Sequence, residues 1–398
     1  MSRKSFTALA DDLTGACEIA AIGHRPGLRS IVSMSQQPVE EKADLVVYDT
    51  ETRLCGEEAA VAQVRHLAEK LSDQGNTRFL FKKTDSVMRG PIAAELSTLM
   101  RVMGMQRTIL VPANPHLGRT IEDGIYRIDG VPLDETPFAD DLHHPAKSAA
   151  VVNLLGAVPG IEVHTARPGD TLPTKGIIIG DARTEEDLDS WAGLWDDATL
   201  LAGGGGLFQA LVKTLKRSPV DFPEPTFNQG QYLLVSGTTH IGQQAFLDQL
   251  ETSNIVTVKG TTEDTTEAAG ERWGKQLLQG ETQSRGCVLR MQSEAKPNSG
   301  NATWVAQQLA LATSIALQSG HVDHLIVEGG ATAASIAMQL GWEEFEMMHA
   351  WGPGVVTLAP LKQHKVNFTI KPGSYPWPDT ITREVWPELS NIHDQTIQ

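Results

Sequence analysis

The sequence has few cysteines, no long apolar run and no secretion signal. Its three cysteines, Cys17, Cys55 and Cys287, are spaced in a way that fits neither a disulfide framework nor a zinc site. No apolar run approaches the roughly 20 residues that a membrane-spanning helix needs, and the first residues lack the apolar core of a signal peptide. We therefore expect a cytoplasmic protein that does not span a membrane.

Positive charge is also scarce. The chain has 33 Lys and Arg residues against 49 Asp and Glu residues, which gives a formal net charge of −16 at pH 7. Proteins that bind nucleic-acid backbones present basic surfaces, so no nucleic-acid partner is expected. The composition is typical of a soluble globular protein, with 40% hydrophobic and 21% charged residues, and it leaves open whether the chain forms a homo-oligomer.

Two common nucleotide-binding fingerprints are missing as well. The chain contains neither G-x-x-x-x-G-K-[ST] nor G-x-G-x-x-G. The first absence excludes a standard P-loop, and the second weighs against a nicotinamide-dependent dehydrogenase. A nucleotide site in this chain must therefore be built from other turns.

Short apolar runs alternate with amphipathic stretches along the chain. The strand-like runs are residues 6–10, 44–48, 79–82, 108–111, 176–180, 231–237 and 324–328. Residues 57–74 and 92–103 carry apolar side chains at helical spacing. Such alternation predicts an α/β fold with two domains, each a mostly parallel sheet flanked by helices.

A proline-rich segment is the predicted boundary between the two domains. Residues 217–227 include three prolines, which are incompatible with a regular helix or strand and typical of a linker. We place the N-terminal domain at residues 1–217, the linker at residues 218–230 and the C-terminal domain at residues 231–398.

Two adjacent acids, Asp11 and Asp12, follow the first predicted strand where a helix should begin. The carboxyl ends of strands carry the chemistry of many α/β enzymes. Neighbouring carboxylates repel, so a lysine, an arginine, a metal ion or a substrate ammonium group should lie close by. Helix capping is the alternative explanation for one of the acids. We expect Asp11 to be the cap and Asp12 to be the reactive carboxylate.

A second polar cluster, residues 82–90, follows another predicted strand. It contains three cations, one acid and two hydroxyl groups. Lysine offers a point charge, arginine a planar fork, and aspartate an acceptor for hydroxyl groups or protons. The cluster can therefore hold an anionic ligand with several hydroxyl groups, although a solvated loop with local ion pairs would look similar.

Glycine-rich turns follow two predicted strands of the second half, at residues 236–239 and 329–332. Glycine lets backbone amides approach phosphate oxygens, and the helix N-terminus that follows favours negative charge. Each turn alone is weak evidence, since glycine is often only a conformational requirement. For the run of four glycines at residues 203–206 we favour close packing over phosphate binding.

Taken together, the motifs resemble the four-carbon acid sugar kinases. The matching segments include residues 10–16 (ADDLTGA), 83–90 (KTDSVMRG), 112–115 (PANP), 118–120 (GRT), 129–133 (DGVPL), 236–239 (SGTT) and 329–332 (GGAT). They span almost the whole chain in order. The resemblance implies an N-terminal domain that holds a tetronate-type acid sugar and a C-terminal domain that binds ATP.

The resemblance also assigns residues to the two sites. The implied substrate pocket comprises Asp11, Asp12, Arg53, Lys82, Lys83, Thr84, Asp85 and Arg89. The implied ATP site comprises Ser236, Gly237, Thr238, Thr239, Gly329, Gly330, Ala331, Thr332 and Gly373. We expect Asp12 first and Asp85 second as the acceptor of the hydroxyl proton, and no metal ligand is assigned. The chain departs from the family pattern at His240, at Ala331 and in residues 371–376.

The predicted function is an ATP-dependent kinase that phosphorylates a hydroxyl of a small four-carbon sugar acid, such as a tetronate or 3-oxo-tetronate. Its ligands would be the sugar acid and ATP, with Mg²⁺ bridging the phosphates. Two alternatives stay open. A sugar-acid dehydrogenase would use similar strand ends, and a non-catalytic sensor would bind the acid without producing ADP.

Overall fold

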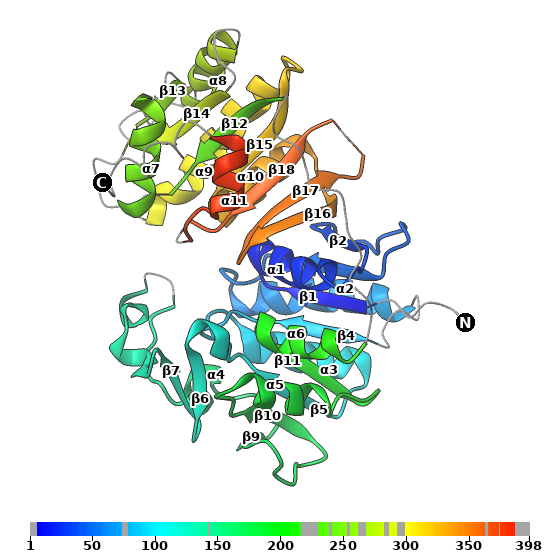
Figure 1. Ribbon diagram of the computed structural model, residues 1–398. Coiled ribbons are helices and arrows are strands. Elements are labelled where there is room, and N and C mark those ends of the chain that lie inside the picture. Colours follow the sequence, from blue (N-terminus) through cyan, green and yellow to red (C-terminus); the bar gives the residue numbers. More distant parts are fainter. Residues whose placement is uncertain are drawn as a thin grey trace. The chain divides into compact units, whose positions relative to one another are not determined.

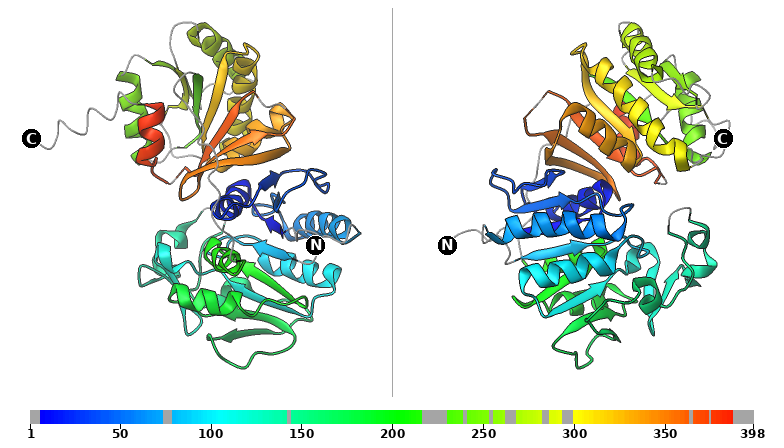
Figure 2. Two further views of the ribbon diagram at one scale, coloured as in Figure 1. Left: turned by 45° about the vertical axis from the view of Figure 1, so that its right-hand side comes forward. Right: turned by 180° about the vertical axis from the view of Figure 1, so that it is seen from behind.

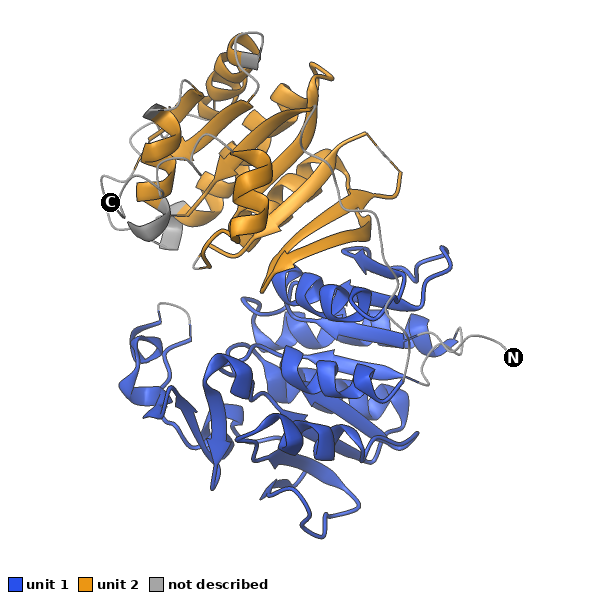
Figure 3. Cartoon of the chain, in the orientation of Figure 1, with its two compact units in different colours: residues 1–221 blue, residues 222–398 orange. Residues whose placement is uncertain are grey.

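The chain consists of two compact units, Met1–Asp221 and Phe222–Gln398 (Figure 3). The computed structural model describes residues 6–73, 79–141, 144–215, 230–238, 241–252, 255–261, 268–281, 286–292, 299–362, 365–373 and 375–386. The division falls within the predicted linker, of which residues 218–229 lie outside the described residues. Thr239 of the predicted ATP site also lies outside them.

Unit 1 contains a parallel sheet whose strands follow the order β2-β3-β1-β4-β11-β5-β10-β9. In that order the strands are β2 (Ser30–Ser33), β3 (Leu45–Asp49), β1 (Phe6–Ala10), β4 (Leu80–Lys83), β11 (Thr199–Gly203), β5 (Arg107–Val111), β10 (Gly176–Gly180) and β9 (Val163–Ala166). Strands β1, β10 and β11 are buried along their whole length and consist mainly of apolar residues and glycine, as expected for a parallel sheet covered on both faces.

Helices cover both faces of this sheet. They are α1 (Leu13–His24), α2 (Glu57–Asp73), α3 (Ile92–Met103), α4 (Val151–Leu155), α5 (Glu185–Ala192) and α6 (Gly205–Lys213), with short 3₁₀ turns at Pro115–Leu117, Leu133–Glu135 and Pro137–Asp140. Helices α2 and α3 pack together on one face, and α1, α6 and α5 lie on the other (Figures 1 and 2).

A small antiparallel sheet of unit 1, β6 (Arg119–Glu122), β7 (Ile125–Ile128) and β8 (Val131–Pro132), was not predicted. Its strands are too short to show a clear periodicity. Both turns are Asp-Gly pairs with positive φ, 53° and 71° at Asp123 and Gly124 and 50° and 83° at Asp129 and Gly130. Asp-Gly is a strong hairpin signal, so these turns could have been recognised from the sequence.

Unit 2 has the strand order β13-β14-β12-β15-β18-β17-β16. The strands are β13 (Val256–Gly260), β14 (Gly286–Met291), β12 (Gln231–Ser236), β15 (Val322–Glu328), β18 (Asn367–Lys371), β17 (Val355–Pro360) and β16 (Glu344–Gly352). The first five pair in parallel, whereas β17 is antiparallel to both neighbours. The predicted fold class, two α/β domains with mostly parallel sheets, is confirmed.

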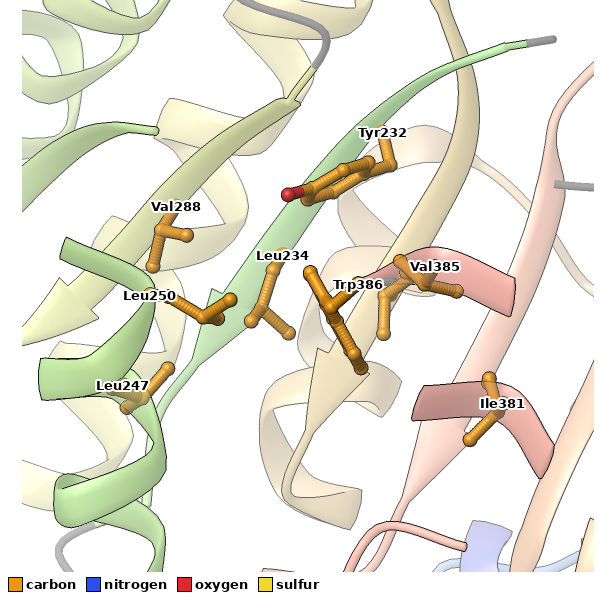
Figure 4. Packing of buried hydrophobic residues seen from close by; sticks show 9 residues of the cluster. Tyr232, Leu234, Leu247, Leu250, Val288, Ile381, Val385 and Trp386 are labelled. Atoms are coloured by element: carbon orange, nitrogen blue, oxygen red, sulfur yellow. The ribbon is translucent and has the colours of Figure 1, made fainter. Parts of the chain in front are cut away.

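The helices of unit 2 define where a ligand can bind. Helices α7 (Ile241–Thr252) and α11 (Asp379–Val385) lie on one face, where Leu247 and Trp386 join a buried cluster with β12 (Figure 4). Helices α8 (Ala269–Glu281), α9 (Ser299–Leu317) and α10 (Gly330–Leu340) pack together on the other face (Figure 2). The chain therefore leaves the neighbouring strands β12 and β15 toward opposite faces, and ligands of open α/β sheets bind at such a switch point.

Candidate active site

Two acids at the end of β1 share one arginine. Arg53 donates from Nε and Nη2 to the two carboxylate oxygens of Asp11, at 2.8 and 2.9 Å. It also donates from Nη1 and Nη2 to Asp12, at 2.5 and 2.9 Å. Burial alone would raise the pKa of Asp11, but Arg53 and Lys82 hold it below its usual value. Arg53 thus supplies the cation that adjacent carboxylates require.

The helix cap is Asp12 rather than Asp11, which corrects the sequence-based assignment. Asp12 has extended backbone, and its Oδ1 accepts a hydrogen bond from the Gly15 amide at 2.7 Å. Its Oδ2 accepts one from the Thr14 hydroxyl at 2.6 Å. Asp11 is instead buried, and its carboxylate accepts hydrogen bonds from Arg53. One carboxylate therefore caps α1 and remains partly open to solvent.

Asp85 forms a tight pair with Arg89 in the loop after β4. Its Oδ2 accepts from the Val87 amide and from the Arg89 amide and Nε, and its Oδ1 accepts from Arg89 Nη2 at 2.9 Å. Burial would raise the pKa of Asp85, but the Arg89 hydrogen bonds and the charge of Arg53 hold it well below its usual value. Asp85 is therefore a poor proton acceptor.

The two predicted lysines are buried and paired with acids. Lys82 Nζ lies 3.1 Å from Glu95 Oε1 of α3, and Lys83 Nζ lies 3.1 Å from Glu18 of α1. Burial raises the pKa of Glu95 although Lys82 opposes the shift. Neighbouring Thr84 is buried, and its hydroxyl has no hydrogen-bond partner among the described residues. Lys82 and Lys83 thus neutralise acids of unit 1.

Asp49 is a buried acid at this site that the sequence analysis did not select. It ends β3, in register with Ala10 at the end of β1, and only 2% of it is exposed. Its Oδ1 accepts from the Glu51 amide at 2.8 Å, whereas Oδ2 has no partner in the described part of the chain. Burial, and then the charges of Glu51 and Asp12, raise its pKa well above the usual value. Its position at the end of a predicted strand is the feature by which Asp49 could have been selected from the sequence.

We expect Asp49→Asn to stabilise the protein at neutral pH. A carboxyl whose pKa is raised by folding lowers stability above its unfolded pKa, about 3.9, because the folded state resists its ionisation. The amide carries no such penalty. Thermal unfolding followed at several pH values should therefore show a higher midpoint for the variant at pH 7 and equal midpoints near pH 3. A lower midpoint at pH 7 would show that the ionised carboxylate stabilises the fold.

In unit 2 the structure gathers the predicted nucleotide residues around the ends of β12, β15 and β18. The Gly237 amide donates to the Glu328 carbonyl at 3.3 Å, and the Gly329 amide to the Lys371 carbonyl at 2.8 Å. A side chain at Gly237 would collide with Thr332. Gly329 has a φ of 103°, which favours glycine, and it immediately precedes α10. The two turns are therefore neighbours at the switch point.

A buried ion pair between Glu328 and Lys371 connects these turns, and sequence analysis missed it. The side chains lie 3.4 Å apart, and both are fully buried. Glu328 also accepts hydrogen bonds from Ser236 Oγ and Trp377 Nε1, each at 2.7 Å. Lys371 Nζ donates to the carbonyls of Pro372 and Tyr375, at 3.1 and 2.6 Å. The Ser236 hydroxyl hydrogen is thus committed to Glu328 and unavailable to a phosphate.

Arg290 places a further buried cation beside the Ser236–Thr238 turn. It is the second-last residue of β14, in register with Ser236, and its Nη1 pairs with Asp248 at 2.6 Å. Its Nη2 donates to Gln244 at 2.8 Å, and Gln244 in turn donates to the Thr238 carbonyl at 2.8 Å. Its Nε has no partner among the described residues. Asp248 already pairs with this cation, and Arg290 connects β14 to the Thr238 turn through Gln244.

The glycine run after β11 serves packing, as the sequence analysis favoured. A Cβ atom at Gly203 would collide with the Val111 carbonyl, and one at Gly205 with the Glu18 carboxylate. One at Gly206 would lie 2.9 Å from Leu188 Cδ1. These approaches bring α6 close to its neighbours.

No cluster of three or more His, Cys, Asp or Glu side chains suited to a metal ion occurs within the described ranges. Within the same ranges, none of the helices combines the length and apolarity that a membrane span requires.

Comparison with known families decides the family. Residues 6–211 match the sequence model of the protein family described as the sugar-binding N-terminal domain. The chain belongs to this family. The match covers the strand ends that carry Asp11, Asp12, Arg53 and residues 82–89, and the resemblance to the four-carbon acid sugar kinases is confirmed.

Curated relatives of the family carry kinase names. The chain is 33% identical to a D-threonate kinase of Salmonella typhimurium over 51% of this chain and 52% of that protein. It is 29% identical to a D-erythronate kinase of Heliobacterium modesticaldum over 46% of each. These alignments span about half the length of the relatives. A 3-oxo-tetronate kinase of Pseudomonas fluorescens is 24% identical over 94% of each chain.

Solved structures show the same fold over nearly the whole chain. A Haemophilus influenzae protein has a TM-score of 0.72 with 20% identity, covering 94% of this chain and 98% of its own. A protein from Salmonella typhimurium LT2 has a TM-score of 0.78 with 20% identity, covering 95% and 98%.

Proposed function

We propose that this protein is an ATP-dependent kinase that phosphorylates a hydroxyl group of a four-carbon sugar acid, such as a tetronate or 3-oxo-tetronate. The main support is the network of Asp11, Asp12, Arg53, Asp85 and Arg89 at the strand ends of the family's sugar-binding domain. Relatives named D-threonate kinase and 3-oxo-tetronate kinase support the same substrate class.

The reaction requires alignment, charge neutralisation and a proton acceptor. The substrate hydroxyl oxygen forms a bond to the γ-phosphorus, the bond to the β,γ-bridging oxygen breaks, and ADP leaves. We assign the hydroxyl proton to Asp12. Both carboxylates are hydrogen-bonded at both oxygens, but the Asp12 side chain is 25% exposed and that of Asp85 only 5%.

Two features of the switch point of unit 2 support the proposal that it binds a nucleoside triphosphate. The amides that follow Gly329 begin an 11-residue helix, and such amides suit phosphate oxygens. Arg290, which is paired with Asp248, lies beside the other turn. Magnesium takes most of its ligands from phosphates and water, so ATP sites do not need a dense protein metal cluster. When bound, Mg²⁺ would neutralise charge on the β- and γ-phosphates.

An ADP-release assay with a panel of four-carbon aldonic and oxo-aldonic acids tests this function. We expect ADP to form with at least one acid and to require both ATP and the acid. Nicotinamide reduction by the acids would instead identify a dehydrogenase. Acid binding without ADP would identify a sensor. No ADP above background with any acid would overturn the proposal.

Glu328→Gln should weaken ATP binding specifically. Glutamine retains the size of the side chain but removes the charge that compensates Lys371, whose pKa burial already lowers. We expect Lys371 and the Ser236 turn to lose the carboxylate that both of them contact. The KM for ATP should rise about 10-fold, as for loss of one charge-assisted contact, with the KM for the acid unchanged.

Thr369→Val is the matched control for this variant. Thr369 lies two residues before Lys371 on β18, and its hydroxyl bonds to buried Thr357 at 2.7 Å. Its loss should lower stability without changing the KM for ATP. Equal ATP affinity in the Glu328→Gln protein and the wild type would show that Glu328 only maintains the fold.

A further inference from the structure

The cations predicted to bind the substrate carboxylate are already paired with acids of the protein. The pairs are Arg53 with Asp11 and Asp12 at 2.8 and 2.5 Å, Lys82 with Glu95 at 3.1 Å, Lys83 with Glu18 at 3.1 Å, and Arg89 with Asp85 and Asp141 at 2.9 and 3.0 Å. A substrate carboxylate would have to displace one of these partners. Separating a buried pair is costly because it leaves a charge uncompensated.

Arg119 differs from these four cations. Its Nη1 donates to the hydroxyl of Ser86, which is a neutral group. Within the part of the chain that the structure describes, Arg119 forms no ion pair with a carboxylate. The residue is half-buried, so a ligand can reach it. Arg119 therefore carries a positive charge with no carboxylate of the described residues within ion-pair distance.

Arg119 belongs to the same network as the proposed proton acceptor. Ser86 follows Asp85, and Asp85 Oδ1 lies 3.7 Å from Nη2 of Arg53, which binds Asp12. The Tyr126 hydroxyl donates to the Ser86 carbonyl and fixes this loop from the other side. A ligand held by Arg119 would therefore lie along the same strand ends as Asp12.

The backbone around Arg119 is held in place before any ligand binds. The Arg119 amide donates to the Asn114 carbonyl at 3.1 Å, and the Asn114 amide donates to the Arg119 carbonyl at 2.8 Å. Gly118 has a φ of 67°, and a side chain there would collide with Asp129. The motif segments 112–115 and 118–120 thus hold the backbone of Arg119 in a fixed position. This lowers the entropy that is lost when the side chain becomes ordered on a ligand.

We propose that Arg119 recognises the carboxylate of the sugar acid and makes the site selective for acids over neutral polyols. A guanidinium presents five N–H donors in a planar fork that matches the two oxygens of a carboxylate. Only one of these donors is engaged by Ser86. This inference rests on the proposed kinase function and adds the residue that sets its substrate class.

Arg119→Gln tests the assignment. The KM for the best acid substrate should rise roughly 10- to 100-fold, the range expected for loss of a charge-assisted contact. Inhibition by the matched neutral tetritol should not change, so the ratio of acid to tetritol affinity should collapse. Arg119→Lys keeps the charge but not the fork and should give an intermediate KM. Thermal unfolding of each variant checks that it is folded.

Arg127→Gln is the control. Arg127 lies on the same hairpin and is also half-buried, and its side chain donates a hydrogen bond to the Gly130 carbonyl at 3.3 Å. We expect its acid KM to equal that of the wild type. An active wild type together with an unchanged acid-to-tetritol ratio in Arg119→Gln and Arg119→Lys would overturn the assignment. A wild type that is inactive on every acid would instead overturn the proposed function.

Discussion

Asp12→Asn is expected to lower turnover by about 100-fold or more, the usual contribution of a general base, while both substrates still bind. Asparagine is also a good helix cap, so its oxygen can still accept from the Gly15 amide. Arg53 keeps both hydrogen bonds to Asp11. The variant thus removes the proton acceptor and its charge, and its amide NH2 group cannot accept the hydrogen bonds that Asp12 Oδ2 receives from Thr14 and Arg53.

Steady-state kinetics with binding measured by calorimetry checks this result. Thr14→Val is the matched variant, because it removes the 2.6 Å hydrogen bond to Asp12 but leaves the carboxylate in place. Its turnover should fall by less than about 10-fold, as expected for loss of one hydrogen bond. Near-normal turnover in Asp12→Asn would remove Asp12 from the role of base.

Arg53→Met should destabilise unit 1 by about 3–5 kcal/mol, because removing one partner of a buried ion pair leaves charges uncompensated. The Arg53 side chain is 16% exposed and lies within 4 Å of the carboxylates of Asp11, Asp12 and Asp85. Calorimetric unfolding at pH 7 should show the loss. The exposed pair of Arg167 and Asp123 is the control, with side chains 68% and 64% exposed. Arg167→Met should leave the unfolding midpoint nearly unchanged, because exposed ion pairs contribute little to stability.

The effect of Arg53→Met should depend on pH. Folding holds the pKa values of Asp11 and Asp85 below their unfolded values. Their contribution to stability is therefore present above about pH 4 and is lost as pH falls through the folded pKa values. In the variant these acids lose Arg53, and protonation relieves the repulsion. The difference from the wild type should shrink toward pH 3, and a constant difference would show that Arg53 acts through packing.

The sequence predicted the parts of the fold that rest on local patterns. Buried strands such as Phe6–Ala10 and Gly176–Gly180 appear where expected, because short runs that are mainly apolar suit a sheet covered on both faces. Strands β16, β17 and β18 were not predicted from the sequence. They are partly polar and depend on antiparallel pairing between segments whose register no local pattern reveals.

The site was predictable only as residue types at strand ends. Asp12 and Arg53 were selected from the sequence, but the pairing that joins them spans 41 residues. Arg119 contacts Ser86 across 33 residues, and Glu328 contacts Ser236 across 92. Such contacts depend on tertiary structure. The roles given to Arg119 and Glu328 could therefore be recognised only from the fold.

Phosphorus NMR of a reaction with ATP and the best four-carbon acid tests the kinase account most directly. We predict that a phosphomonoester resonance of the sugar acid grows at the same rate as ADP, and that both slow together in Asp12→Asn. Inorganic phosphate growing in place of the phosphomonoester would contradict the account, since ATP would then be hydrolysed without transfer to the acid.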